Sequence, residues 1–329
     1  MTPIAPHISA FLRERLPHQR GASPHTCDSY AYSFQLLFEF ASRRFGLKPS
    51  DLTLEQIDSQ LVMDFLASLE TDRGNSPSTR NARLAAIKSF MHFVEYRVPA
   101  LLEQIRQVLA IPKKKTEQPL IQHLTVEEMQ AILNAPDIQS RAGIRDRAMM
   151  HVCFAAALRV AELISLPLTA LTWQPTPTLH IQGKGRRHRA LPLWQQTADD
   201  VRAWLAVRGE IGAPELFVSH QRRAMTRTGF TYVLNKHVQR AVQDCPSLKE
   251  KNVTPHVLRH TCALMIYQAT GDLRKVSLWL GHANMQATEV YVRADPTEKL
   301  DALDAVIPPS LRRGQFTVPD RLIAMLHGQ

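Results

Sequence analysis

The chain has 329 residues, 44% of them hydrophobic, which is enough for a separate core in each of two domains. Lys and Arg outnumber Asp and Glu by 40 to 30, giving a formal net charge of +10 that favours a polyanionic partner such as nucleic acid. The four cysteines are far apart, which argues against a disulfide framework and against a cysteine zinc site. No apolar run reaches membrane-spanning length. We therefore expect a cytoplasmic protein.

Residues 1–111 are predicted to form a helical domain. Serine followed by proline begins two of its helices, at residues 23–24 and 76–77. The second of these helices has a core stripe at helical spacing, made of Leu84, Ile87, Met91 and Val94. Arg80 and Arg83 lie off this stripe, so they form either a solvated face or contacts to DNA phosphates.

A basic linker is predicted at residues 112–122, within "IPKKKTEQPLIQH". Two prolines and three consecutive lysines there separate two regions of helical periodicity, which is typical of an extended interdomain segment. The lysines Lys113, Lys114 and Lys115 are candidates for DNA binding.

Residues 123–310 are predicted to form a second, mainly helical domain. "GIRDRAMMHVCFAAALRVAELISL" indicates a long buried helix, a break and a shorter helix. Strand patterns occur only in "TLHIQGKGRRHRALPL", which predicts a small antiparallel β-hairpin or sheet whose basic tip carries Lys184, Arg186 and Arg187. In the tail at 311–329, the segment 317–327 is predicted to contain a short helix that begins at Pro319.

The segment "TPHVLRHTCA" places His256 and His260 at a spacing that would let them share a metal ion. A metalloprotease helix needs a glutamate after the first histidine to act as the base, and here that residue is Val257. Thr254 and Pro255 predict a helix start, so His256 lies in a first turn, where free N–H groups favour anions. Arg259 follows one turn later on the same face, and the site suits phosphate better than a cation. An incidental basic pair remains the alternative, and His260 is expected to pack or to support a neighbour.

Arg159 interrupts the apolar stretch "CFAAALRVAELISL", and a buried guanidinium needs an anionic partner. Glu162 supplies one three residues later, either as a structural ion pair or to orient Arg159 toward a phosphate. Lys184 by itself is typical of an exposed turn, and Tyr291 by itself is typical of packing. Taken together, arginines, histidines, a lysine and a hydroxyl are the groups that metal-free phosphoryl transfer requires.

The ordered motifs "ALRVAEL", "GKG", "HVLRH", "LGH" and a tyrosine nine residues after that last histidine resemble the tyrosine recombinase, or phage integrase, family of site-specific DNA recombinases. The resemblance covers about residues 123 to 295, and the N-terminal helices with the basic linker resemble the family more loosely. It implies a two-domain, C-shaped clamp around double-stranded DNA that works without a metal or nucleotide cofactor. It also implies a homo- or hetero-tetramer on paired sites, linked by the C-terminal helix. The tail resembles that of transposon-borne members.

The resemblance implies that Arg159 and Arg259 clamp the scissile phosphate, with Glu162 supporting Arg159. His282 would donate a hydrogen bond to a phosphate oxygen. One position departs from the family pattern, because Ala157 stands where glycine often precedes the "LR" pair. This departure alters the expected local backbone and leaves the implied catalytic groups in place.

The resemblance also implies that Tyr291 attacks the phosphate and forms a 3′-phosphotyrosyl link. Lys184 would protonate the 5′-hydroxyl leaving group, and His256 would transfer a proton. Two alternatives stay open. One is a metal-dependent phosphodiesterase that uses His256, His260 and His282, and the other is a DNA-binding regulator without catalysis.

Overall fold

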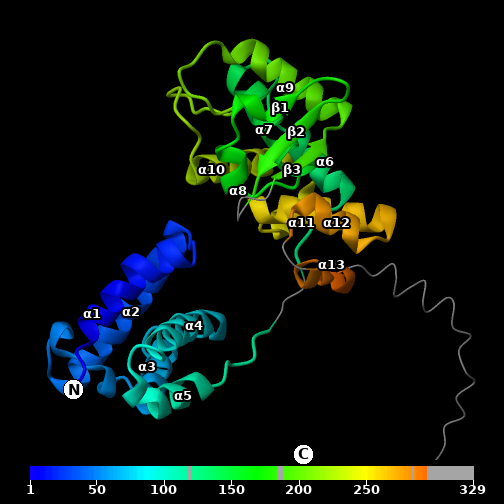
Figure 1. Cartoon of the computed structure of the whole chain (residues 1–329). Coiled ribbons are helices and arrows are strands. Elements are labelled where there is room, and N and C mark those ends of the chain that lie inside the picture. Colours follow the sequence, from blue (N-terminus) through cyan, green and yellow to red (C-terminus); the bar gives the residue numbers. More distant parts are fainter. Residues whose placement is uncertain (118–120, 184–187, 283–284, 295–329) are drawn as a thin grey trace, which may run out of the picture. The chain divides into compact units, whose positions relative to one another are not determined.

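The computed structural model describes residues 1–117, 121–183, 188–282 and 285–294 (Figure 1). The chain divides into two compact units on either side of the bond between residues 118 and 119. Each unit has its own hydrophobic core. The described residues contain no helix that is long and apolar enough to cross a membrane. The predicted fold class, mainly helical with one small antiparallel sheet, is confirmed.

The first unit consists of helices around an aromatic core. Its α-helices are α1 (Ile4–Ala10), α2 (Pro24–Phe45), α3 (Ser59–Thr71), α4 (Pro77–Val94) and α5 (Leu102–Ala110), and α1 continues as a wider helix over Phe11–Gln19. The two predicted helix starts are confirmed, because Ser23 and Ser76 accept hydrogen bonds from backbone N–H groups in the first turns of α2 and α4. In the core, the rings of Phe11, Phe34 and Phe90 lie edge to face with centroids 5.4 to 6.0 Å apart.

Arg80 lies inside this unit, whereas the sequence predicted a free surface position on α4. It is 8% exposed, and its guanidinium donates to the carbonyl of Pro112 at 3.4 Å and approaches Glu70 at 3.7 Å. Beside it, the Asn81 side chain donates to the carbonyl of Lys114 and accepts from its N–H, and the Lys114 ammonium pairs with Glu70 at 2.8 Å. Residues 112–114 are therefore held against α4 and α3, within the segment expected to be a free linker.

The second unit combines eight α-helices among its described residues with a three-stranded sheet. The helices are α6 (Val126–Asn134), α7 (Arg141–Ala155), α8 (Val160–Ile164), α9 (Gln195–Arg208), α10 (Arg227–Ala241), α11 (Pro255–Thr270), α12 (Leu273–Leu280) and α13 (Glu289–Ala294). The antiparallel strands β1 (Leu171–Thr172), β2 (Thr178–Gln182) and β3 (His188–Pro192) follow the order β1-β2-β3. Thus β2 and β3 are the predicted hairpin, β1 extends it, and the tip at 184–187 lies outside the described residues.

Helix α11 is central to the second unit and contacts α7, α12 and α13. It begins where predicted, since the Thr254 side chain accepts a hydrogen bond from the Val257 N–H. Its inner face is apolar and fully covered, with Leu258, Cys262 and Ala263 at most 1% exposed. Because this face packs against α7, the rotation of the helix about its axis is fixed. The directions in which its polar side chains project are therefore fixed as well.

The break between α7 and α8 passes through a left-handed residue. Ala157 has φ of 46° and is completely buried. An L-residue with a Cβ atom takes this conformation at a cost of about 1–2 kcal/mol, which glycine does not incur. This explains the glycine that the family often has here. The turn also aims the Ala157 carbonyl at Arg259, whose guanidinium donates to it.

Ala157→Val is expected to lower the free energy of unfolding of the second unit by about 3 kcal/mol or more, because a β-branched residue resists positive φ and has no room in a closed site. Urea unfolding followed by tryptophan fluorescence measures this unit alone, since Trp173, Trp194, Trp204 and Trp279 all lie in it. Ala157→Gly is the matched control and should stay within about 1 kcal/mol of wild type. Equal stabilities for the valine and glycine variants would contradict the left-handed assignment.

Candidate active site

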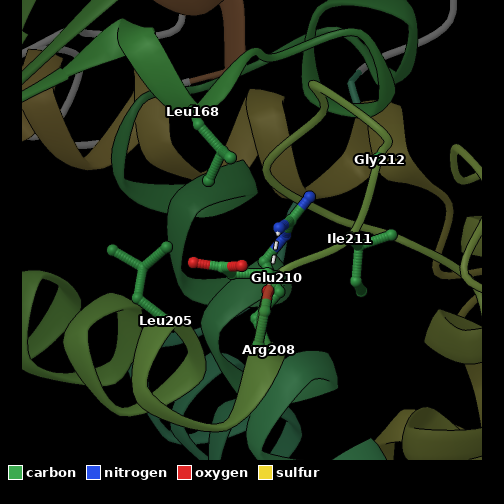
Figure 2. A pocket seen from close by; sticks show the side chains of 7 residues that line it. Leu168, Leu205, Arg208, Glu210, Ile211 and Gly212 are labelled. Atoms are coloured by element: carbon green, nitrogen blue, oxygen red, sulfur yellow. Dashed lines mark hydrogen bonds between the residues drawn. The ribbon is translucent and has the colours of Figure 1, made fainter.

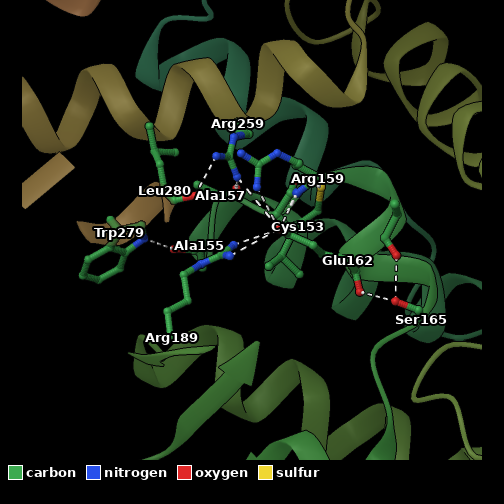
Figure 3. Close-up of polar contacts among 12 residues, drawn as sticks. Cys153, Ala155, Ala157, Arg159, Glu162, Ser165, Arg189, Arg259, Trp279 and Leu280 are labelled. Carbon is green, nitrogen blue, oxygen red and sulfur yellow. Dashed lines mark hydrogen bonds and ion pairs between the residues drawn. The ribbon is translucent and has the colours of Figure 1, made fainter. Parts of the chain in front are cut away.

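A buried carboxylate organises the polar centre of the second unit. The Glu162 side chain is 6% exposed and accepts from Arg159 at 2.9 Å and from Arg189 at 2.8 Å. A third guanidinium, that of Arg259, lies 4.0 Å from the same carboxylate. Figure 3 shows the three arginines around Glu162. The polar centre therefore has more positive charge than its own carboxylate balances, which suits it to a second anion.

The Arg159–Glu162 pair predicted from the sequence is present. The sequence suggested that the arginine would be the buried member, but in the structure it is the glutamate. The Arg159 side chain is 34% exposed, whereas the carboxylate is covered. Arg159 occupies the N-cap position of α8, and its own backbone N–H donates to Glu162 at 3.0 Å. Hence the acid is the group that needed partners, and the guanidinium retains an open side for a ligand.

Arg259 is held by backbone carbonyls at the ends of two helices. It is 4% exposed and donates to the carbonyl of Ala157 and, at 2.8 Å, to that of Leu280. Burial, followed by the charge of Arg159, lowers the pKa of Arg259 to about 10, so the guanidinium stays charged at neutral pH. Two of its five N–H donors are used in these bonds, and the guanidinium also lies 4.0 Å from Glu162.

Arg189, on β3, belongs to the site although no pattern in the sequence singled it out. Both of its terminal nitrogens donate to Glu162, at 2.8 and 3.3 Å. It also packs on Gly281 of the "LGH" motif, where an added Cβ would lie 3.1 Å from the guanidinium. Gly281 has φ of 63°, so both its conformation and this close approach favour glycine. Arg189 thus joins the hairpin, Glu162 and the residue before His282.

The histidines predicted for the site have different surroundings. His256, in the first turn of α11, is exposed. His282 forms a hydrogen bond between Nδ1 and the Thr288 hydroxyl at 2.9 Å, and Thr288 is fully buried. Across the described residues, no three His, Cys, Asp or Glu side chains gather as metal ligands, and the geometry does not favour the metal-dependent reading of His256, His260 and His282.

Tyr291, on α13, is 1% exposed, and its hydroxyl lies 2.9 Å from Nδ1 of His260. The sequence suggested only packing or support for His260, so this direct contact was missed. The position of His260 directly after Arg259, on a helix whose opposite face is apolar, could have indicated that its side chain faces the site. Among the predicted site residues, the described structure brings Arg159, Glu162, Arg259, His282 and Tyr291 together, and, besides burial, Arg259 and Arg159 shift the pKa of both His282 and Tyr291.

The protonation states in the cluster follow from burial beside cations. Burial raises the pKa of Tyr291 to about 12, although Arg259 and Arg159 pull it down. Burial and the positive charge of Arg259 lower the pKa of His282 to about 4. Burial alone would raise the pKa of Glu162, but hydrogen bonds from Arg189 and from the Arg159 backbone keep it below its usual range. At neutral pH the site has a carboxylate, charged arginines, a neutral His282 and a protonated phenol.

The other predicted residues lie either away from this cluster or outside the described residues. Lys184, Arg186 and Arg187 at the hairpin tip, and the predicted helix at 317–327, lie outside the described residues. Arg83 connects α4 to α2 by donating to the Ser33 hydroxyl at 2.9 Å and stacking over Tyr32. Lys113 and Lys115 are exposed.

A separate pocket lies by the end of α9 and is shown in Figure 2. Its cationic group, Arg208, is 4% exposed and donates to the carbonyls of Gly209, Ala213 and Glu215 at 3.3, 2.7 and 2.9 Å. Because these bonds engage its terminal nitrogens in holding the following loop, this pocket does not match the arginine cluster as an anion site.

Comparison with protein families gives two matches along the chain. The phage integrase family matches residues 122–298, more than half of the chain, and the phage integrase N-terminal SAM-like domain matches residues 8–97. The two matches fall in the second and the first compact unit, respectively.

Individual relatives extend over almost the whole chain. A putative integrase/recombinase, y4rC, of Sinorhizobium fredii is 39% identical and covers 98% of both chains. A tyrosine recombinase XerC of Pelobacter propionicus is 28% identical and covers 94% of this chain and 97% of its own. Among solved structures, the XerH site-specific recombinase in a post-cleavage complex with palindromic difH shares the fold, with a TM-score of 0.66, 22% identity and coverage of 87% and 81%. The chain belongs to the phage integrase family of site-specific tyrosine recombinases.

Proposed function

We propose that this chain cleaves and rejoins double-stranded DNA at specific sites through a 3′-phosphotyrosyl intermediate. The observation that carries the proposal is that the Tyr291 hydroxyl lies 2.9 Å from His260, the residue that follows Arg259 on α11, while Arg259 and Arg159 both lie within 4.0 Å of Glu162. A nucleophile and a cation pair in one site are what phosphoryl transfer needs, since the reaction gathers charge on the phosphate oxygens.

In the first step the scissile phosphate binds between Arg159 and Arg259. Arg159 offers the open side of its guanidinium, and Arg259 offers the donors that its two carbonyl partners leave unused. The phosphate adds the negative charge that Glu162 alone does not supply to three arginines. His282, which is hydrogen-bonded to Thr288, contributes a hydrogen bond to a phosphate oxygen.

In the second step the Tyr291 oxygen attacks the phosphorus and the bond to the 5′ oxygen breaks. Lys184 gives a proton to that oxygen, and His256 takes part in proton transfer at the phosphate. Rejoining reverses these steps when a 5′-hydroxyl attacks the phosphotyrosyl bond and the tyrosine leaves. Since energy is conserved in the phosphotyrosyl link, the chain's own residues carry the reaction in both directions.

Arg189 acts as a positioning residue in this scheme. It fixes the carboxylate of Glu162 from β3, and the carboxylate in turn fixes Arg159. Because Lys184 precedes β3 by four residues in the sequence, the same ion pair connects the proposed acid to the proposed phosphate site.

The first unit supplies contacts to the DNA backbone. A pocket between its first helices and α4 is lined by Arg15, Arg20, Lys88 and Lys113, and a partly buried Lys88 has its pKa lowered by burial and by Lys113. Such like charges side by side favour a polyanion. Arg83 and Lys115 remain proposed contacts, together with Arg186 and Arg187 of the second unit. Arg80 is buried against Pro112 and Lys114 is paired with Glu70, so neither is proposed as a contact. In this proposal both units contact the same duplex.

The proposed assembly is a tetramer of identical or related chains on two paired sites. The relative XerH was solved on a palindromic substrate, and a palindrome offers equal half-sites to two copies. We propose that residues 317–327 dock on the neighbouring copy and so link the protomers. We place the reaction in the cytoplasm, consistent with four free cysteines among the described residues, two of them buried.

Tyr291→Phe is expected to bind DNA as wild type does and to form no covalent adduct, because only the attacking hydroxyl is removed. The assay uses nicked suicide duplexes from DNA that flanks the coding sequence, with adducts separated on denaturing gels and the attached residue mapped by mass spectrometry. A wild-type chain that binds these duplexes and never forms an adduct would support the non-catalytic regulator, and an adduct formed by the phenylalanine variant would refute the assignment of Tyr291.

Arg189→Met is expected to lower the free energy of unfolding of the second unit by about 3 kcal/mol or more, because it removes a partner from a buried carboxylate. Single-turnover cleavage should also slow at saturating DNA, since Arg159 loses its fixed support. Glu162→Gln with Arg189→Met should cost less than the sum of the two single changes, by about 1–3 kcal/mol. Additive costs in this double-mutant cycle would show that the pair does not act as a unit.

Lys113→Ala combined with Lys115→Ala is expected to weaken DNA binding and to make the plot of log affinity against log salt shallower by about 0.9 for each phosphate that the variant no longer neutralises. Fluorescence anisotropy with the same flanking duplexes measures both quantities. Lys114→Ala is the matched control and should change the slope less, because its ammonium is already paired with Glu70. An unchanged slope in the double variant would show that neither lysine binds a DNA phosphate.

A further inference from the structure

His260 contacts the reacting atom of the proposed nucleophile. Its Nδ1 lies 2.9 Å from the Tyr291 hydroxyl oxygen, and the two ring centroids are 5.8 Å apart. The tyrosine side chain is 1% exposed, so bulk water has almost no access to it. The two residues come from α11 and α13, which contact each other.

The direction of this hydrogen bond follows from the protonation states. Burial, together with the charges of His256 and Arg259, lowers the pKa of His260 to about 4, so the imidazole is neutral at pH 7. The phenol keeps its proton, because its own pKa is raised to about 12. The hydroxyl therefore donates and Nδ1 accepts, which fixes the neutral tautomer with its proton on Nε2.

A phenol must lose its proton as its oxygen bonds to phosphorus, and a group already in hydrogen-bond contact is best placed to receive it. His256 is exposed in the first turn of α11, and its ring centroid lies 6.3 Å from that of His260, on the side of the helix start. The contact to the hydroxyl is thus made by His260.

We propose that His260 is the catalytic base that takes the Tyr291 proton during attack, and that His256 serves the phosphate oxygens instead. The bond from the Tyr291 oxygen to phosphorus forms as the phenol proton passes to Nδ1. The bond from phosphorus to the 5′ oxygen breaks, and Lys184 supplies a proton to that oxygen. In rejoining, the imidazolium returns its proton to the departing tyrosine oxygen.

The charge balance supports transfer only with DNA in place. Without DNA, Arg259 beside His260 disfavours a second positive charge. A bound phosphodiester between Arg159 and Arg259 brings a negative charge that offsets this repulsion, so the imidazolium becomes accessible when the substrate is present. The proton acceptor is therefore coupled to substrate binding, and water is not needed as an intermediary.

This inference rests on the proposed function and is tested by single-turnover cleavage of the same nicked duplexes. In His260→Asn the amide occupies the place of Nδ1 and can hold the hydroxyl, but it does not take up a proton at neutral pH. Both His260→Asn and His260→Ala are expected to bind DNA with the wild-type Kd and to cleave about 100-fold or more slowly. His220→Asn, at an exposed histidine of the same unit, is the matched control and should cleave at the wild-type rate.

A second substrate, with sulfur in place of the bridging 5′ oxygen, separates the base from the acid. Sulfur leaves without protonation, so it should restore cleavage to Lys184→Ala and leave both His260 variants slow. Cleavage by His260→Asn within a few-fold of wild type would overturn the proposal and leave His260 only a positioning role, and sulfur rescue of His260→Asn would overturn it as well. The proposed function fails separately, if the wild-type chain forms no Tyr291 adduct.

Discussion

The polar centre of the second unit depends on one buried carboxylate. Glu162 lies where guanidinium groups from three parts of the chain converge, namely the N-cap of α8, strand β3 and helix α11. Without this negative charge, three cations at such short range would repel one another, and the one buried on α11 would have only carbonyl dipoles as partners. With Glu162 present, the cluster keeps a net positive charge, which favours binding of a second anion. The structural ion pair therefore also forms part of the proposed phosphate site.

The cluster also determines what its neighbours can do. Positive charge and burial together keep His260 and His282 neutral, so both can accept a proton or donate one hydrogen bond, and neither repels the arginines. The same burial keeps Tyr291 protonated until a partner removes its proton. In the proposed mechanism a substrate phosphate would change these protonation equilibria, because its negative charge offsets the positive charge of the arginines. In this mechanism, DNA is then both the substrate and the group that changes these protonation equilibria.

Backbone conformation also contributes to this arrangement. The carbonyls that hold Arg259 come from Ala157 and Leu280, each next to or within a turn with a left-handed residue, Ala157 itself and Gly281. Such turns end α7 and α12 abruptly and leave carbonyl oxygens that no helix uses. Those oxygens then orient a guanidinium in the interior. The alanine at the first turn achieves this with a conformation that glycine adopts more easily.

Features that depend on neighbours along the chain could be predicted from the residues alone: the helix starts at Ser23, Ser76 and Thr254, the β2–β3 hairpin, and the Arg159–Glu162 pair, whose members are three residues apart. Local hydrogen bonds and side-chain periodicity set all of these. Other features exist only in the folded chain: Arg80 is buried under the start of the linker, Arg189 reaches Glu162 from 27 residues away, and His260 meets Tyr291 from 31 residues away. Tertiary packing within each unit brings these partners together, and no spacing in the sequence encodes such contacts.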